Sequence, residues 1–227
     1  MERTGKIIKI FPEKRYGFIE DQKENIIWFH FNELMDLNHE EKGLVVFRLS
    51  HDAEKPQKDR AYKIRKIRYT ADGEPVADRA YGSHLHQGVE DVLSFALQKI
   101  KGEGRYLLEE EIKFPHPVGY QECVPTTEED DIFYARRLNR NGHSRFVRNR
   151  KKIETDTLVV ILRRKKLYWE IITAFFGHLA EVEPFDKKAG QASWDFWTTH
   201  ALIEGSDPIE EESIVKDCPW EKKAGWK

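Results

Sequence analysis

The segment from residue 16 to residue 31 constrains the fold most, because two kinds of side chain alternate along it. One kind is an aromatic or imidazole ring, and the other is aliphatic, glycine or, at position 29, phenylalanine. Successive side chains of a β-strand point to opposite faces, so this alternation predicts two strands that each bury one face. The outward set is Tyr16, Phe18, Trp28 and His30, and the inward set is Gly17, Ile19, Ile27 and Phe29.

The first 69 residues contain short apolar runs separated by turns, and helical periodicity is almost absent from them. A flat sheet of this size would leave open edges that pair with other chains, so the pattern predicts a small closed barrel of five strands. The expected strands lie at 7–11, 16–19, 26–29, 45–47 and 62–64.

The stretch GKIIKIFPEKRYGFIED, followed by IIWFHFNEL, resembles the cold-shock domain, and the likeness continues through GLVVFRL and DRAYKIRKI. It covers residues 4–69. Residues 16–19 stand where this family has its first RNA-binding motif, and residues 28–31 stand where it has the second. The resemblance implies an oligonucleotide-binding (OB) barrel whose partner is single-stranded RNA, with single-stranded DNA as an alternative.

The resemblance also implies which residues bind nucleic acid. Two of them depart from the family, since Lys9 stands where many members carry a tryptophan and Arg15 replaces a glycine. Both changes add charge, so phosphate contacts are expected to replace part of the stacking. The alternative is a barrel that only docks the rest of the chain, with Trp28 buried at the joint. The expected binding residues of the barrel are Lys9, Lys14, Tyr16, Phe18, Trp28, His30 and Phe31.

Residues 70–83 contain Gly73, Pro75 and Gly82 and little aliphatic periodicity, which predicts a linker. Ser83 is a candidate N-cap for an amphipathic helix whose apolar positions run from 89 to 100. Surface or capping roles are expected for the histidines in its first turn, His84 and His86.

Residues 84–227 are expected to form a second domain of the α+β class, an antiparallel sheet flanked by helices, with an acidic C-terminal tail. Strands are predicted at 132–135, 144–147, 158–162 and 168–175, the last two as a hairpin. A helix is predicted over 194–203, capped by Ser193 and ended by Gly205.

No Walker loop, zinc-binding cysteine pair or HExxH motif is present, so we expect neither a cofactor nor a metal. Cleavage of RNA by its own 2′-hydroxyl needs only a base, an acid and a cation on the phosphate, which histidine and arginine supply. The candidate catalytic residues are His116, Arg145, Thr173 and His200.

Residues 84–205 resemble, faintly, the compact bacterial ribonucleases grouped with barnase, colicin and toxin endonucleases, most closely in Ile-Thr-Ala-Phe at 172–175. The resemblance implies a metal-independent endoribonuclease that leaves a 2′,3′-cyclic phosphate. Each candidate also has a structural interpretation: Thr173 suits any strand, His200 suits an aromatic helix face, and His116 suits a loop between prolines.

The charges are segregated although the formal net charge is only -2. Residues 130–166 carry twelve Lys/Arg and four Asp/Glu, whereas residues 178–227 carry six and eleven. This segregation of charge favours a basic face that binds an anionic partner, with Arg148 and Arg150 as phosphate contacts. It also favours an acidic tail that contacts a protein partner. The alternative is that the two halves neutralise each other.

Three functions therefore stay open: an RNA-binding ribonuclease, a non-catalytic RNA-binding protein, and a protein adaptor of an RNA-processing machine.

No apolar stretch reaches the about 18 residues that span a bilayer, and no signal peptide is evident. Cys123 and Cys218 are expected to be free thiols in a reducing cytoplasm, with a disulfide as the alternative.

Overall fold

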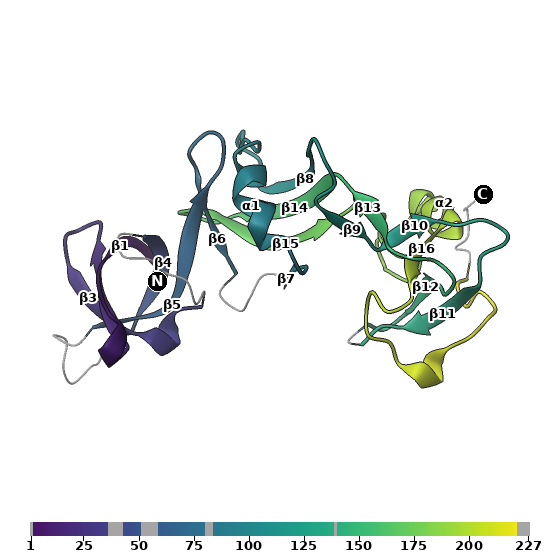
Figure 1. Ribbon diagram of the computed structural model, residues 1–227, viewed down its shortest axis with the longest axis horizontal. Coiled ribbons are helices and arrows are strands. Elements are labelled where there is room, and N and C mark those ends of the chain that lie inside the picture. Colours follow the sequence, from purple (N-terminus) through teal and green to yellow (C-terminus); the bar gives the residue numbers. More distant parts are fainter. Residues whose placement is uncertain (1, 36–42, 51–58, 80–83, 139, 222–227) are drawn as a thin grey trace. The chain divides into compact units, whose positions relative to one another are not determined.

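The computed structural model describes residues 2–35, 43–50, 59–79, 84–138 and 140–221 (Figure 1). The chain divides into two compact units. Unit 1 comprises Met1–Ile112 and Val160–Ala174, and unit 2 comprises Lys113–Val159 and Phe175–Lys227. The chain thus leaves unit 1 and later returns to it, whereas the sequence predicts one break at residues 70–83.

Five strands form a closed barrel in unit 1. The first strand pairs antiparallel with the second and the fourth, the fourth pairs antiparallel with the fifth, and the third closes the barrel through a parallel bridge between Trp28 and Arg60. The predicted closed barrel of five strands is confirmed, and it is consistent with the OB type. The strands are β1 (Glu2–Phe11), β2 (Tyr16–Asp21), β3 (Ile26–His30), β4 (Leu44–Ser50) and β5 (Arg60–Tyr69), with 3-10 turns η1 (Pro12–Lys14) and η2 (Phe31–Glu33).

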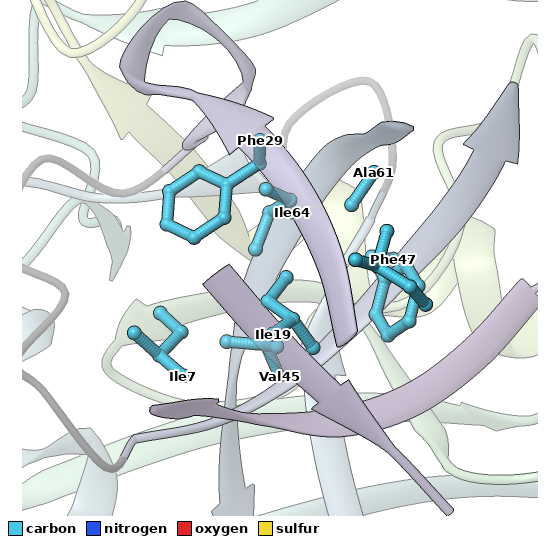
Figure 2. Packing of buried hydrophobic residues seen from close by; sticks show 8 residues of the cluster. Ile7, Ile19, Phe29, Val45, Phe47, Ala61 and Ile64 are labelled. Atoms are coloured by element: carbon cyan, nitrogen blue, oxygen red, sulfur yellow. The ribbon is translucent and has the colours of Figure 1, made fainter. Parts of the chain in front are cut away.

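The inward set of the alternating segment fills the barrel (Figure 2). Ile19 and Phe29 are fully buried, and Ile27 is almost so. Gly17 is required by this packing, because a Cβ there would lie 2.6 Å from the Phe29 ring. The complete cluster is Ile7, Ile19, Ile27, Phe29, Val45, Phe47, Ala61 and Ile64.

The sheet of unit 1 continues beyond the barrel. Strand β6 (Pro75–Asp78), inside the predicted linker, pairs with β5, and β15 (Trp169–Phe176) lies parallel to β6. The sheet then continues through β14 (Thr157–Arg164) to β8 (Leu107–Lys113), while the short β7 (His84–Leu85) also pairs parallel with β15. Helix α1 (Glu90–Leu97) lies within the predicted helical stretch, and Ser83 lies outside the described residues.

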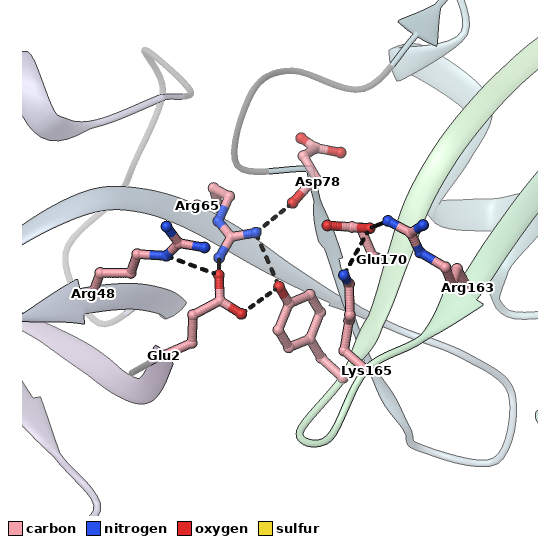
Figure 3. A network of polar contacts seen from close by, with 8 residues as sticks. Glu2, Arg48, Arg65, Asp78, Arg163, Lys165 and Glu170 are labelled. Atoms are coloured by element: carbon pink, nitrogen blue, oxygen red, sulfur yellow. Dashed lines mark hydrogen bonds and ion pairs between the residues drawn. The ribbon is translucent and has the colours of Figure 1, made fainter. Parts of the chain in front are cut away.

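A buried polar network connects the barrel to the β14–β15 hairpin (Figure 3). The Arg65 side chain is fully buried and donates to the carbonyl of Asp78 at 2.8 Å, to the Tyr168 hydroxyl at 3.1 Å and to Glu2 at 2.6 Å. The Tyr168 hydroxyl in turn donates to Glu2 at 2.9 Å. Burial of the Tyr168 phenol raises its pKa to about 12.

Unit 2 contains a four-stranded sheet with the order β10, β16, β12, β11. Two small apolar clusters and several ion pairs stabilise unit 2. Its elements are β10 (Cys123–Pro125), β11 (Ile132–Arg136), β12 (His143–Val147), β16 (His200–Ile203), α2 (Gln191–Thr199), the β9 (Gly119–Gln121) and β13 (Ile153–Thr155) pair, and the 3-10 turn η4 (Glu211–Ser213).

Two predictions for residues 84–227 need correction, and a third is not confirmed. The helix predicted over 194–203 ends at Thr199, and residues 200–203 form strand β16, because they pair with β10 and β12. The sheets are not purely antiparallel, since β12–β16, β6–β15 and β7–β15 are parallel pairs. The α+β class is not confirmed, because strands predominate and only α1 and α2 are α-helices in the described part of the chain.

Candidate functional site

The register of β1, β2 and β3 arranges the outward side chains of the barrel in three rows. Directly paired residues on neighbouring strands point to the same face, so each row runs across the three strands. The first row is Phe11, Tyr16 and His30; the second is Lys9, Phe18 and Trp28; the third is Lys6, Glu20 and Ile26.

Five rings in the first two rows form a continuous patch, which we call the ring surface: Phe11, Tyr16, Phe18, Trp28 and His30. The ring centroids of Phe11 and Tyr16 are 4.9 Å apart, and those of Tyr16 and Phe18 are 5.7 Å apart. Trp28 lies 6.4 Å from Tyr16 and 6.4 Å from His30. Each ring therefore has a ring neighbour within the usual range for aromatic pairs.

The ring surface remains open to solvent in unit 1. Trp28 is 37% exposed, whereas its chain neighbours Ile27 and Phe29 are 3% and 0% exposed. Tyr16, Phe18 and His30 are half-buried by one another. Trp28 is therefore not part of the barrel core.

Basic side chains border the ring surface along β1 and the turn that follows it. The Lys9 ammonium lies 4.8 Å from the centroid of the Phe11 ring. Lys14 and Arg15 are exposed next to Tyr16. Arg15 has φ 55°, a left-handed conformation that glycine adopts at less cost, and its guanidinium donates to the Asn32 side chain at 3.4 Å.

His30 has a defined hydrogen-bond role at the edge of the ring surface. The backbone N–H of Asn32 donates to its Nδ1 at 3.2 Å. The neutral imidazole therefore carries its proton on Nε2, which leaves this nitrogen as a donor.

Phe31 differs from the other aromatic residues predicted to bind nucleic acid. It packs against the barrel core and stacks on Phe29, with ring centroids 6.3 Å apart. It lies in η2, after β3 has ended, so it is not a member of the three rows.

Arg148 and Arg150 are paired with carboxylates of unit 2. Arg148 donates to Glu204 at 3.0 Å, and this hydrogen bond raises the arginine pKa. Arg150 donates to Asp130 at 2.6 Å, and this hydrogen bond raises the pKa of Arg150. The same hydrogen bond lowers the pKa of Asp130 to about 2.

Three arginines of the basic stretch pair with carboxylates of the acidic tail in unit 2. Arg136 pairs with Glu210 at 2.9 Å, and Arg137 pairs with Asp207 at 2.8 Å. Together with the Arg148–Glu204 pair, these contacts occupy three carboxylates of the tail.

Two of the four candidate catalytic residues lie together in unit 2. Arg145 on β12 donates to the backbone carbonyl of His200 at 3.0 Å and to the Thr126 hydroxyl at 2.9 Å. The His200 ring is stacked on Phe196, with centroids 4.1 Å apart, and its Nδ1 lies 3.1 Å from the Phe196 carbonyl.

The other two candidates lie elsewhere in the chain. His116 is exposed in the loop between β8 and β9 and belongs to unit 2. Thr173 is half-buried on β15 and belongs to unit 1.

A different histidine is adjacent to Thr173. Strands β7 and β15 are parallel, and their register pairs His84 with Thr173. The backbone N–H of His86, an exposed residue, donates to the carbonyl of Ala174 at 3.1 Å. The sequence placed His84 and His86 in a helical turn, because strand β7 is too short to produce an alternating pattern.

Within the described ranges, no group of three or more histidine, cysteine, aspartate or glutamate side chains could hold a metal ion. The two cysteines are free thiols, and burial of Cys123 raises its pKa to about 12, with a further contribution from Glu183. Among the helices that the structure describes, none has the length and apolarity that a membrane crossing requires.

Comparisons with known proteins add little to this geometry. No family model and no curated protein sequence matches the chain. Among solved structures, it is similar to the Drosophila Unr CSD456 structure, with 11% sequence identity and a TM-score of 0.24 over 79% of this chain. The match spans 63% of the Unr chain. The resemblance of residues 84–205 to ribonucleases receives no support from these comparisons.

Proposed function

We propose that this chain binds single-stranded RNA through the ring surface of its barrel. The observation that carries the proposal is the contiguity of five rings on one open face of β1–β3. Stacking of an unpaired base on an aromatic side chain contributes about 1–3 kcal/mol, and it tolerates any base because every base has a π face. Rings in a row can therefore bind successive nucleotides.

The charges near the rings favour a polyanion over a neutral ligand. The corresponding face of OB barrels binds either oligonucleotides or oligosaccharides. Here Lys9, Lys14 and Arg15 border the rings, and cations of this kind attract a phosphate backbone. Glu20 in the third row carries the opposite charge, so we expect the bound strand to follow the first two rows.

Fluorescence anisotropy with a labelled 12-nucleotide RNA tests the proposal. The full chain should bind the single strand at least tenfold more tightly than the same sequence as a duplex, because bases in a duplex are not free to stack on protein rings. Affinity should rise as salt falls. Equal binding of the two forms, or no binding at low salt, would contradict the proposal, and a matched DNA strand tests the choice of RNA.

A second candidate function is metal-independent RNA cleavage, and the hydrogen bond from Arg145 to the carbonyl of His200 in unit 2 favours it. In this reaction the 2′-oxygen attacks the phosphorus atom, a base takes the 2′-proton, and the 5′-oxygen leaves with a proton from an acid. Histidine can serve as base or acid at neutral pH, and an arginine guanidinium can donate to the phosphate oxygens. We propose His116 and His200 for the proton transfers and Arg145 for the phosphate contact, all three within unit 2.

Product analysis distinguishes cleavage from binding alone. Incubation of the full chain with labelled single-stranded RNA in EDTA should give fragments ending in 2′,3′-cyclic phosphate. The variants Arg145→Ala and His200→Ala should lower the rate at least tenfold. Intact RNA with a mobility shift would leave only the binding function.

A further inference from the structure

One ring of the ring surface, Phe11, lies outside both motifs on which the cold-shock resemblance rests. The resemblance leaves β1 without a stacking ring, because Lys9 stands where many members have tryptophan. Phe11 is two residues further along the same strand and is paired with Tyr16 in the first row. It is the one ring that β1 contributes to the ring surface.

A bulge in β1 turns Phe11 to the outer face. Ile7 is fully buried in the barrel, and in a regular strand Lys9 and Phe11 would share its face. The register with β2 shifts between Ile7 and Lys9, which inserts Ile8 as an extra residue and reverses the alternation. Ile10 therefore packs against the core. The backbone of β1 therefore places the Phe11 side chain on the outer face of the barrel.

The surroundings of Phe11 suit a base that is attached to a phosphate. Its ring is tilted by 31° against Tyr16 and meets Phe18 edge to face at 6.2 Å. The Lys9 ammonium lies over the ring, 4.8 Å from its centroid, so a base that stacks on this face moves the flexible lysine aside, where its ammonium can reach the phosphate. A nucleotide presents the complementary pair, an anionic phosphate and a flat base.

We propose that Phe11 is the first-strand stacking residue of the RNA-binding face and that Lys9 contacts the phosphate of the nucleotide stacked there. This inference rests on the proposed RNA-binding function. In this arrangement the rings that stack on bases extend along the first row from His30 to Phe11. Phe11 replaces the tryptophan that many cold-shock domains carry at the position of Lys9.

The competing interpretation is that Phe11 only supports Tyr16 by packing. Phe11→Leu separates the two, because leucine keeps most of the apolar volume but has no ring. The matched control is Ile26→Ala, since Ile26 is 55% exposed on the same outer face, in the third row. Affinity of the full chain for a labelled 12-nucleotide RNA is measured for both variants and for Phe11→Tyr.

We expect Phe11→Leu to weaken binding by about 5- to 100-fold, the effect of losing one base–ring stack, while Ile26→Ala changes it less than about twofold. Phe11→Tyr should bind within about twofold of the wild type, because it keeps a ring at this position. The inference would be overturned if Phe11→Leu bound with wild-type affinity or lost no more than Ile26→Ala. A large loss in Phe11→Tyr would also overturn it. If the wild-type chain does not bind RNA, the proposed function itself fails.

Discussion

At the scale of single residues, two positions in the barrel show how local chemistry shapes the turns beside the ring surface. Arg15 holds a left-handed backbone conformation between η1 and β2. Asp21 is a buried carboxylate that organises the turn from β2 to β3 through hydrogen bonds from Lys23 and Asn25. Each position leads to a prediction.

Replacing Arg15 by glycine should stabilise the barrel by about 0.5–1 kcal/mol. The left-handed conformation costs a non-glycine residue about 1–2 kcal/mol, and the greater freedom of glycine in the unfolded chain offsets part of the gain. Denaturant unfolding measures the change. Lys14→Gly is the control, since Lys14 lies within η1 without a positive φ and its replacement should destabilise. A loss of stability in Arg15→Gly would contradict the argument.

The stability that Asp21 contributes should depend on pH. Burial raises its pKa, but the hydrogen bonds from Asn25, Lys23 and Arg3 outweigh burial and hold the pKa below the ordinary value of 3.8. A lowered pKa stabilises the folded state above the unfolded value, and this contribution disappears as pH falls through the folded pKa. The difference in unfolding free energy between the wild type and Asp21→Asn should therefore be constant above about pH 5 and shrink below 3.8.

The exposed Glu24 in the same turn supplies the control for Asp21. Glu24→Gln should change the unfolding free energy by less than about 0.5 kcal/mol. A difference between the wild type and Asp21→Asn that does not vary between pH 2 and pH 7 would show that the carboxylate charge is not what stabilises this turn.

At the scale of secondary-structure elements, strands β2 and β3 act as one unit because Phe18 and Trp28 are directly paired. One face of this hairpin closes the core, and the other carries four of the five rings. A substitution on the outer face should therefore alter ligand binding with little effect on stability.

The double variant Phe18→Ala, Trp28→Ala should weaken RNA binding more than Lys9→Ala or Lys14→Ala. Two lost stacks amount to about 2–6 kcal/mol, whereas loss of one phosphate contact mainly reduces the salt dependence of binding, by about one unit of slope. Titrations at several salt concentrations separate the two effects. Equal losses in the ring and lysine variants would show that the rings are not used for stacking.

At the scale of the whole molecule, the chain order does not follow the division into units. Residues 160–174 return to unit 1 and complete it. Tyr168 from this returning segment is buried against the barrel sheet with Val46, Ile67 and Ala77. The stability of the barrel should therefore depend on residues more than 90 positions away in the sequence.

Arg65→Ala should test this dependence, with an expected loss of about 3–5 kcal/mol in unfolding free energy. The variant removes the donor shared by Glu2, Asp78 and Tyr168, and it leaves the Glu2 carboxylate without its closest cation. The neighbouring Lys66 is exposed, so Lys66→Ala should cost less than about 0.5 kcal/mol. Similar losses in both variants would mean that the buried network does not stabilise unit 1.

The barrel could be predicted from the sequence because its signals are local. Alternation with a period of two marks β2 and β3 and separates Ile19, Ile27 and Phe29 from the rings. The position of Phe11 could not be read in this way, because the bulge at Ile8 interrupts the period.

Beyond the barrel, the prediction was weaker wherever the partners are distant in sequence. Residues 200–203 have a pattern that suits the end of a helix, yet pairing with β10 and β12 makes them a strand. The two-residue strand β7 exists only because β15 lies next to it, so His84 could not be placed beside Thr173 from the sequence.

By itself, the sequence determined the five-stranded barrel, the part of its core on β2 and β3, and four of its five surface rings, because strand alternation is a property of neighbouring residues. Only the tertiary structure decided that three arginines of the basic stretch pair with the acidic tail, that Arg65 is buried among Glu2, Asp78 and Tyr168, and that His84 is paired with Thr173. The physical reason is that ion pairs, buried polar networks and parallel strand pairs join segments far apart in the chain, and no local pattern specifies which segments meet.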